Sequence, residues 1–457
     1  MHASDAALPA QAAAAARQTF ATRLGVVASM IGVSVGLGNF WRFPYLVGQF
    51  GGAAFVLFYL LVVLAIAVPG LMAEWALGRH TGRGTVGAFE RAGLPLGRPL
   101  GWFLFLAVLG ANAYYCVAIG WVLCFALAEI AALLGAEFSP AAVLPPADGF
   151  DARSFSLQLV FTSAVLVAAA VILLNGLRAG IERASRALIP LMFVVLLVLI
   201  VRSLTLPGAF AGVGWYVLKF EPGDLTGRVM VAALGQAVFS IGLGGTLMVV
   251  YGSYLGRGEN LRTSALWTAS ADTAAGLLAG LVIFPAVFAL GLEPASGPRL
   301  IFDTLPRVFE AIPAGAAFAS LFYAALFSAA LLSAVAAAEV LVAGLTDNTR
   351  LSRRRAILVT VVAILLLSVP PTINLRIFVP WDLTFGSGML TFGALMAALA
   401  FGWALDRSAA LAELASGGEG PPPVWLYYWI RYVVPGGILL VGLWWLVTEV
   451  MRATPAV

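Results

Sequence analysis

The stretch GVSVGLGNFWRFP, residues 32–44, lies in the middle of the first long apolar segment of the chain. Its three glycines weaken a helix at a depth where a membrane-spanning helix should be regular. Gly32 and Gly36 could instead form a small-residue face that lets two helices approach closely. The polar Asn39 and the charged Arg42 follow at once, and a charge inside a membrane points to a functional site. Together they favour a binding site in a broken helix, because irregular backbone at this depth persists where it lines a cavity.

The composition is that of a polytopic membrane protein. Hydrophobic residues make up 61% of the chain and charged residues 11%, with a mean hydropathy of +0.98. A soluble domain carries about 25% charged residues. The formal charge of +4 does not indicate nucleic-acid binding, because arginine in a membrane protein reports topology. We expect no enzyme and no organic cofactor, since His2 and His80 lie outside the apolar segments and Cys116 and Cys124 share one of them.

Eleven apolar segments follow one another along the chain. They are 20–46, 53–78, 100–134, 154–174, 184–204, 227–256, 264–291, 316–346, 354–371, 379–405 and 425–449. Arginines gather in the loops after the second, fourth, sixth and eighth segments, which all lie on one side of a membrane. Because basic loops stay in the cytoplasm, we expect a cytoplasmic N-terminus, an extracytoplasmic C-terminus and a place in the inner (plasma) membrane of a bacterium.

The sixth segment repeats the irregularity of the first. It contains GQAVFSIGLGGT, residues 235–246, again glycines with polar groups around them. Five segments separate the starts of the two broken helices, so they cross the membrane in opposite directions. This pattern predicts an inverted repeat with a binding site at the midplane, where helix N-termini face anions and freed carbonyls face cations. The residues therefore favour a secondary transporter for a small anionic or zwitterionic solute with Na+.

Motifs in order over most of the chain resemble one family. They are ATRLG at 21–25, GLGNFWRFP at 36–44, EWALGR at 74–79, Tyr114-Tyr115, GIER at 180–183 with Pro190, the stretch 297–309, and Tyr427 to Pro435. The sequence is identified by them as a member of the neurotransmitter:sodium symporter family, and it is most similar to the bacterial eleven-helix amino-acid transporters.

The resemblance implies an all-α polytopic membrane protein with 11 transmembrane helices. Residues 1–19 would be a cytoplasmic tail that carries an inner-gate arginine. Residues 20–204 and 227–405 would be two inverted five-helix repeats, with helices 1 and 6 broken at the midplane, and 425–449 the eleventh helix.

The resemblance also implies a first sodium site, which the substrate carboxylate would complete. Its protein ligands would be Ser34, Asn39, Ser240 and Asp272. Oxygen ligands suit a hard cation such as Na+. Asp272 would lie near Tyr59, Gln236 and Ser240, where chloride-dependent relatives hold their anion, so we expect chloride-independent transport. The alternative for Asp272 is a solvated charge near a helix end.

A second sodium site is where the sequence departs from the family. The implied ligands are the carbonyls of Gly32, Val35 and Ala329 and the hydroxyl of Ser333. The family usually has another hydroxyl directly before that serine, and here the residue is Leu332. An apolar side chain does not ligate Na+, so the number of ions, one or two, stays open. A register slip in this segment would be a competing explanation.

The substrate pocket carried over from the family contains many small residues. It comprises Ser34, Gly36, Leu37, Gly38, Ala111, Asn112, Tyr115, Phe239, Ser240, Gly242, Gly245, Ser333 and Ala337. Monoamine carriers have an aspartate in place of Gly36, so glycine favours an amino acid with its own carboxylate. The small residues predict a bulky hydrophobic or aromatic substrate, unless neighbouring large side chains fill the space. Asn112 could instead recognise a polar group.

Two charge pairs match the gates of the family. Arg42 and Asp382 would close the outer side, and Arg17 and Asp347 the cytoplasmic side. An ordinary ion pair in a wet vestibule is the alternative for the first. The expected function is sodium-coupled symport of a hydrophobic amino acid by alternating access. The alternatives are transport of another zwitterion or osmolyte, and a transport-dead sensor. The expected partners are the amino acid, sodium and the lipid bilayer, and the oligomeric state is open.

Overall fold

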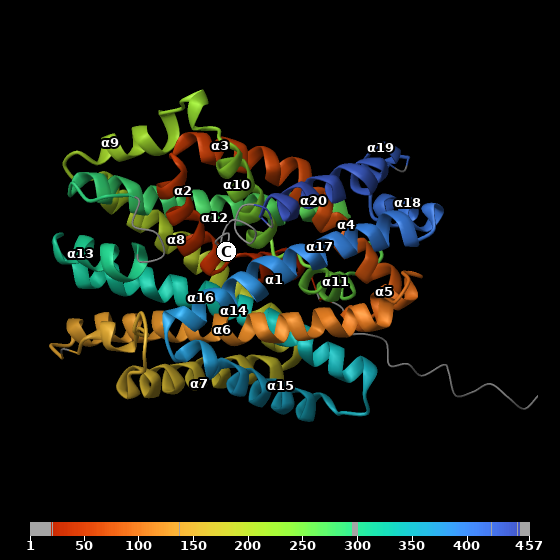
Figure 1. The fold of residues 1–457 in the computed structure, drawn as a ribbon, viewed down its shortest axis with the longest axis horizontal. Coiled ribbons are helices and arrows are strands. Elements are labelled where there is room, and N and C mark those ends of the chain that lie inside the picture. The colour runs from red at the N-terminus through yellow and green to blue at the C-terminus, as the bar shows by residue number, and fades with distance from the viewer. Residues whose placement is uncertain are drawn as a thin grey trace, which may run out of the picture.

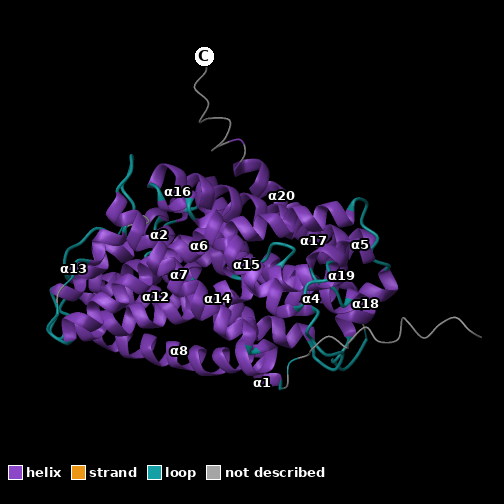
Figure 2. Ribbon diagram, turned by 90° about the horizontal axis from the view of Figure 1, so that it is seen from below, coloured by secondary structure: helices purple, strands orange, loops and turns teal. Residues whose placement is uncertain are grey.

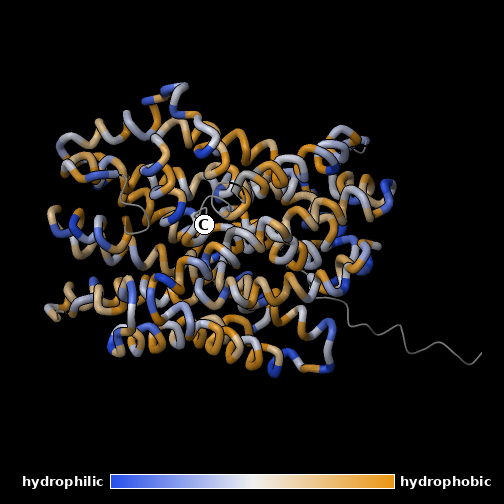
Figure 3. The backbone as a smooth tube through the Cα atoms, viewed as in Figure 1, coloured by the Kyte–Doolittle hydropathy of each residue, from blue (hydrophilic) through white to orange (hydrophobic). Residues whose placement is uncertain are grey.

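The computed structural model describes residues 20, 22–136, 138–294, 300–421, 423–445 and 447. These residues form helices joined by short loops, with no β-strand among them (Figure 2). The long helices run roughly along the longest axis of the molecule (Figure 1). The hydropathy colouring places hydrophilic residues mainly at the ends of the helices and apolar residues along their middles (Figure 3). This distribution is that of a bundle of membrane-spanning helices.

Seven continuous helices in the described ranges are long and apolar enough to span a membrane. They are Ala53–Thr81 (α3 to α4), Gly97–Leu133 (α6), Ala152–Leu174 (α7), Leu177–Leu204 (ending in α8), Leu261–Ala289 (α12), Gly315–Asn348 (α14) and Leu375–Ala404 (including α16 and α17). A bent pair makes eight. The remaining predicted segments coincide with the shorter helices α10 (Gly227–Ser240) with α11 (Leu247–Gly252), α15 (Arg353–Ser368), and α19 (Val424–Tyr428) with α20 (Val434–Trp445). The all-helical, polytopic class is confirmed, while the count of eleven stays a prediction.

Short helices connect the spans. They are α5 (Thr85–Arg91), α9 (Ala209–Val213), α13 (Leu305–Glu310) and α18 (Arg407–Ala415). α14 is the most buried of the seven long spans, whereas α7 and α8 are among the least buried. α14 therefore lies in the centre of the bundle, and the apolar side chains exposed on the outer helices are available to lipid.

The first apolar segment is broken where the glycines predict. α1 (Arg23–Ser34) ends, and one turn later η1 (Gly38–Arg42) leads into α2 (Phe43–Phe50). The two halves meet at an angle of 53°. The Asn39 Oδ1 accepts a hydrogen bond of 2.9 Å from the Gly36 N–H, which satisfies a backbone donor freed by the break.

The second broken helix is also observed. α10 ends at Ser240, and α11 begins only at Leu247. Gly242 and Gly245 adopt φ values of +75° and +67° in the gap, a left-handed conformation that favours glycine. The interruption is therefore built into the sequence by residues that can adopt it.

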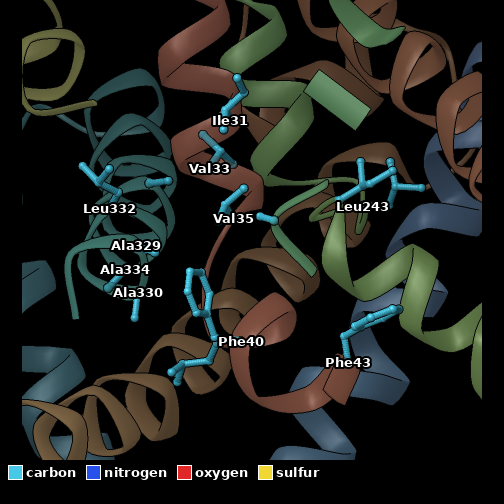
Figure 4. Packing of buried hydrophobic residues seen from close by; sticks show 14 of the residues in the cluster. Ile31, Val33, Val35, Phe40, Phe43, Leu243, Ala329, Ala330, Leu332 and Ala334 are labelled. Atoms are coloured by element: carbon cyan, nitrogen blue, oxygen red, sulfur yellow. The ribbon is translucent and has the colours of Figure 1, made fainter. Parts of the chain in front are cut away.

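A buried carboxylate fixes the gap between α10 and α11. The Glu74 Oε1 on α4 (Val68–Thr81) accepts hydrogen bonds of 2.9 Å from the N–H groups of both Gly244 and Gly245. Packed apolar side chains surround the two breaks. α14, with Ala329 and Leu332, lies beside Val33 of α1 and the following Val35 (Figure 4). The breaks thus lie in the protein interior rather than against lipid.

Candidate functional site

The two helix breaks open onto a common pocket. Its walls are Val33, Ser34, Gly36, Gly38, Val108, Ala111, Asn112, Tyr114, Tyr115, Phe239, Ser240, Gly242, Leu247, Ser333, Ala337 and Leu390. Residues from α1, α6, α10, α11, α14 and α17 (Leu390–Leu399) meet here. The pocket therefore depends on the relative positions of both halves of the chain.

Backbone and hydroxyl groups at the first break form a polar corner of the pocket. The Leu37 N–H donates a hydrogen bond of 3.1 Å to the Tyr115 hydroxyl of α6. Gly36 lies beside the same hydroxyl: a Cβ there would collide with Tyr115 Oη and would lie 2.7 Å from Ser333 Oγ. A side chain at position 36 would therefore clash with the hydroxyl groups of Tyr115 and Ser333.

An oxygen-rich cluster with one carboxylate lies next to this corner. The Asn39 Nδ2 donates hydrogen bonds to Asp272 Oδ1 (2.8 Å) and Ser240 Oγ (3.0 Å). The Ser240 hydroxyl donates to Asp272 Oδ2 at 2.8 Å. The three side chains come from η1, α10 and α12 and are all buried. Asp272 is thus an interior residue, and the alternative of a solvated charge is wrong.

The remaining neighbours expected around Asp272 are also present. The buried Tyr59 lies beside Asp272, Ser240 and Thr273. The Gln236 Nε2 donates a hydrogen bond of 2.9 Å to the Gly38 carbonyl, which ties α10 to the first break. A carboxylate, hydroxyls and carbonyls at one point form a ligand set that suits a hard cation.

The second predicted cation site is only partly formed by protein oxygens. Ser333 Oγ lies 2.9, 3.2 and 3.4 Å from the carbonyl oxygens of Val35, Val33 and Gly32. This contact places Ser333 opposite the end of α1, so the sequence register in α14 is the expected one. The preceding Leu332 is buried and apolar.

Asn112 is engaged by the protein itself. Its Nδ2 donates a hydrogen bond of 3.3 Å to the Ala334 carbonyl of α14, and its Oδ1 accepts a weak one from Cys116 Sγ at 3.7 Å. Both ends of the amide therefore have partners without a ligand. The side chain is better suited to joining α6 and α14 than to recognising a polar substrate group.

The expected outer-gate residues meet above the pocket. The Arg42 guanidinium lies over the Phe239 ring, 4.5 Å from its centroid, and interacts electrostatically with Asp382. Asp382 also hydrogen-bonds Tyr114 of α6. This cluster joins η1, α6 and α10 to the segment that contains Asp382.

The expected inner gate lies partly outside the described residues. Arg17, the expected inner-gate arginine, lies outside the described residues. Its expected partner Asp347 accepts a hydrogen bond of 2.8 Å from the Gly84 N–H through Oδ2. Phe20 is buried and packs against Tyr251 and Tyr254, with ring centroids 6.4 and 6.3 Å away. These rings pack together at the end of the broken helices where the inner gate is expected.

Comparison with known proteins identifies the relatives of this chain. A model of the sodium:neurotransmitter symporter family matches residues 17–137 and 136–455. The chain belongs to this family. A sodium-dependent transporter of Haemophilus influenzae is 33% identical over 93% of the chain and 97% of the relative. The Bacillus subtilis sodium-dependent transporter YhdH is 32% identical over 93% and 96%. These matches confirm the resemblance inferred from the motifs.

A solved structure extends the similarity to three dimensions. The crystal structure of MhsT in complex with L-phenylalanine matches with a TM-score of 0.81 and 35% identity, over 93% of this chain and 99% of that one. The protein is therefore a multi-pass membrane, sodium-dependent transporter with the symporter fold, and it is not an enzyme.

Two pocket residues expected from the family do not line the pocket of this symporter. Leu37 does not line the pocket, although its N–H donates a hydrogen bond to the Tyr115 hydroxyl, which does. Gly245 faces the Gly393 carbonyl of α17, where a Cβ would clash, and its N–H binds Glu74. Gly245 therefore allows close packing behind the site instead of forming its surface.

Sequence reasoning missed several residues of the symporter's site. Val108 lies one helical turn before Ala111 and Asn112, so helical periodicity could have found it. Glu74 was recognised as part of a motif, but nothing in the sequence indicated that it binds the second break. Leu390 had no sequence signal, because α17 reaches the pocket only through the fold.

Proposed function

We propose that this chain is a sodium-coupled symporter of a large hydrophobic or aromatic amino acid and works without chloride. One observation supports this most: the pocket between the two helix breaks adjoins the buried cluster of Asn39, Ser240 and Asp272. A cation held there would lie beside a substrate carboxylate in the pocket. Opposite charges in contact would make the binding of ion and substrate mutually favourable.

The polar corner suits the main-chain groups of an amino acid. The substrate carboxylate would face the backbone N–H groups at Leu37 and Gly38 and the Tyr115 hydroxyl. The carbonyls of Ser34, Phe239 and Ser240 near the helix breaks would accept hydrogen bonds from the ammonium group. The absence of space for a side chain at Gly36 argues against a carrier that uses an aspartate there for an amine without a carboxylate.

The remainder of the pocket suits an apolar side chain. Val108, Ala111, Leu247 and Leu390 contribute to its walls, and the Asn112 amide is engaged by Ala334 and Cys116. MhsT, which shares 35% of its sequence with this chain, was solved with L-phenylalanine. An aromatic amino acid is therefore the first substrate to test.

The proposed independence of chloride rests on the fixed charge of Asp272. The carboxylate is buried beside Tyr59 and Ser240, with Gln236 on the neighbouring turn of the same helix as Ser240. A negative charge of the protein at this point would balance the charge of sodium. A mobile anion would then be repelled rather than required.

Transport would proceed by alternating access. The repeats 20–204 and 227–405 would place the two broken helices in a bundle that moves against the other helices. Sodium would favour the outward-open state by binding it more tightly than the inward-open state. Arg42 with Asp382, and Arg17 with Asp347, would close the two sides in turn. We place the protein in the inner (plasma) membrane with a cytoplasmic N-terminus.

The test is uptake of radiolabelled L-phenylalanine into proteoliposomes. An inward sodium gradient should drive uptake, and an equal potassium gradient should not. Replacing chloride by gluconate should leave the rate unchanged. Unlabelled L-tryptophan and L-leucine should compete better than L-alanine. Sodium-dependent binding without uptake would instead indicate a sensor, and competition by betaine-like osmolytes alone would indicate another substrate class.

A further inference from the structure

The end of α1 presents several backbone carbonyls to α14. The last carbonyls of a helix have no partner within the helix. Here the break after Ser34 leaves those of Gly32, Val33 and Val35 directed at the Ser333 hydroxyl, between 2.9 and 3.4 Å away. Because a serine hydroxyl has one proton, it donates to one carbonyl at a time. The Val35 carbonyl is the nearest acceptor.

The place of a further oxygen ligand is taken by a hydrocarbon side chain. Leu332 precedes Ser333 in α14 and is 3% exposed. Its Cδ1 lies 3.4 Å from the position that a Cβ on Gly32 would occupy, so it packs against the end of α1 beside the carbonyls. Figure 4 shows α14, with Leu332 and Ala329, beside Val33 of α1 and the following Val35. A methyl group in this position supplies no lone pair and restricts the room for water.

The ligands that remain are neutral and few. The carbonyls at this site and one hydroxyl would have to replace the hydration shell of a sodium ion without a carboxylate among them. Taking a charge out of water is costly unless charged or multiple oxygen partners compensate. The first site differs, because Asp272 supplies a full negative charge. The residues at the second site therefore do not fit a sodium ion.

We propose that this transporter binds one sodium ion per cycle, at the Asn39–Ser240–Asp272 cluster, and that the Ser333 hydrogen bond replaces the second ion. Leu332 is then the residue that determines the ion count. This inference rests on the proposed sodium-coupled transport and adds the stoichiometry. The bond from Ser333 joins α1 to α14 directly, so the closing of these helices needs no ion between them.

Radioactive sodium bound at equilibrium to the purified wild-type protein should saturate at one ion per chain. In proteoliposomes at zero membrane potential and equal pH, a tenfold sodium gradient should balance about a tenfold gradient of L-phenylalanine, whereas two ions would sustain about 100-fold. Two bound ions, or the larger gradient, in the wild type would overturn the inference and leave sodium-coupled symport intact. Absence of any sodium-driven flux would reject the proposed function, while the binding count would still decide the number of sites.

Variants of Leu332 make the assignment specific. Leu332→Ser and the bulkier Leu332→Thr restore a hydroxyl and should raise the count to two ions, with a steeper dependence of substrate binding on sodium. Leu332→Met keeps an apolar side chain of similar volume and should stay at one. Monodisperse, substrate-binding protein that still binds one ion in both hydroxyl variants would show that Leu332 does not set the count. Using two hydroxyl variants guards against loss of folding in either.

Discussion

The two predicted cation sites border the same broken helix, yet they differ in charge. At the first, Asn39 and Ser240 hold both oxygens of the buried Asp272 carboxylate. At the second, neutral carbonyls meet a single hydroxyl of Ser333, and the neighbouring position is the hydrocarbon Leu332. The difference teaches that a helix break alone does not make an ion site. Freed carbonyls provide polarity, but a side chain from another helix decides whether an ion or a hydrogen bond satisfies them.

The largest effect should follow removal of the charge at the first site. Asp272→Asn places an amide NH2 against one of two groups that now donate to the carboxylate, Asn39 Nδ2 or the Ser240 hydroxyl. Disrupting a buried charged network costs about 3 kcal/mol or more, which corresponds to at least about 100-fold in sodium-driven uptake. Initial rates in gluconate medium measure this loss.

The same variant should recover part of its uptake when chloride is supplied, because a mobile anion can then take the place of the missing charge. Asp148→Asn serves as the control, because Asp148 forms an ion pair with Arg376 and both side chains are exposed to solvent. Full uptake by Asp272→Asn without chloride would show that the two sites do not differ in the way proposed.

A smaller effect is expected from Ser333→Ala at the second site. The substitution removes one hydroxyl hydrogen bond to the end of α1, worth about 1 kcal/mol, so uptake should fall about fivefold. The number of bound sodium ions should stay at one. Ser328→Ala is the matched control, because Ser328 lies on the same helix and its hydroxyl bonds only locally to the Ala324 carbonyl at 2.8 Å. Loss of all sodium binding in Ser333→Ala would mean that Ser333 belongs to the occupied site.

The smallest effect should come from Ser185→Ala on α8. The Ser185 hydroxyl is buried and lies 2.9 Å from the position of a Cβ on Gly32, so it is a nearby oxygen that could in principle replace the missing ligand. If the second site holds no ion, the sodium concentration for half-maximal uptake should change less than about twofold, because Ser185 then touches no bound ion. Loss of an ion contact worth about 1 kcal/mol would change it about fivefold. A large rise would instead assign an ion ligand to α8 and remove the contrast between the sites.

Much of the fold could be predicted from local sequence. Gly242 and Gly245 adopt left-handed conformations that glycine reaches without strain. The positions of these glycines in the sequence therefore determine where the second helix breaks. Asn39 caps the first break from three residues away. The family motifs then predicted the grouping of Asn39, Ser240 and Asp272, whose meeting in space depends on helices far apart in the chain.

Other features required the tertiary structure. Leu390 and Gly393 reach the site on α17, and no local pattern in that helix differs from ordinary apolar packing. The sequence allowed Asn112 to recognise a polar group of the substrate, but in the structure its amide donates a hydrogen bond to the Ala334 carbonyl. Whether a polar group is free to bind a ligand depends on its partners, and these come from other helices.

The sequence by itself determined the membrane-spanning class, the two helix breaks and the chemical types available at them, because hydropathy and glycine act locally. Only the tertiary structure decided which oxygens converge. It brought Glu74 to the N–H groups of Gly244 and Gly245, and Ser333 to the carbonyls at the end of α1. The physical reason is that hydrogen bonds and ion ligands act over about 3 Å, a distance that packing between helices sets and the order of residues does not.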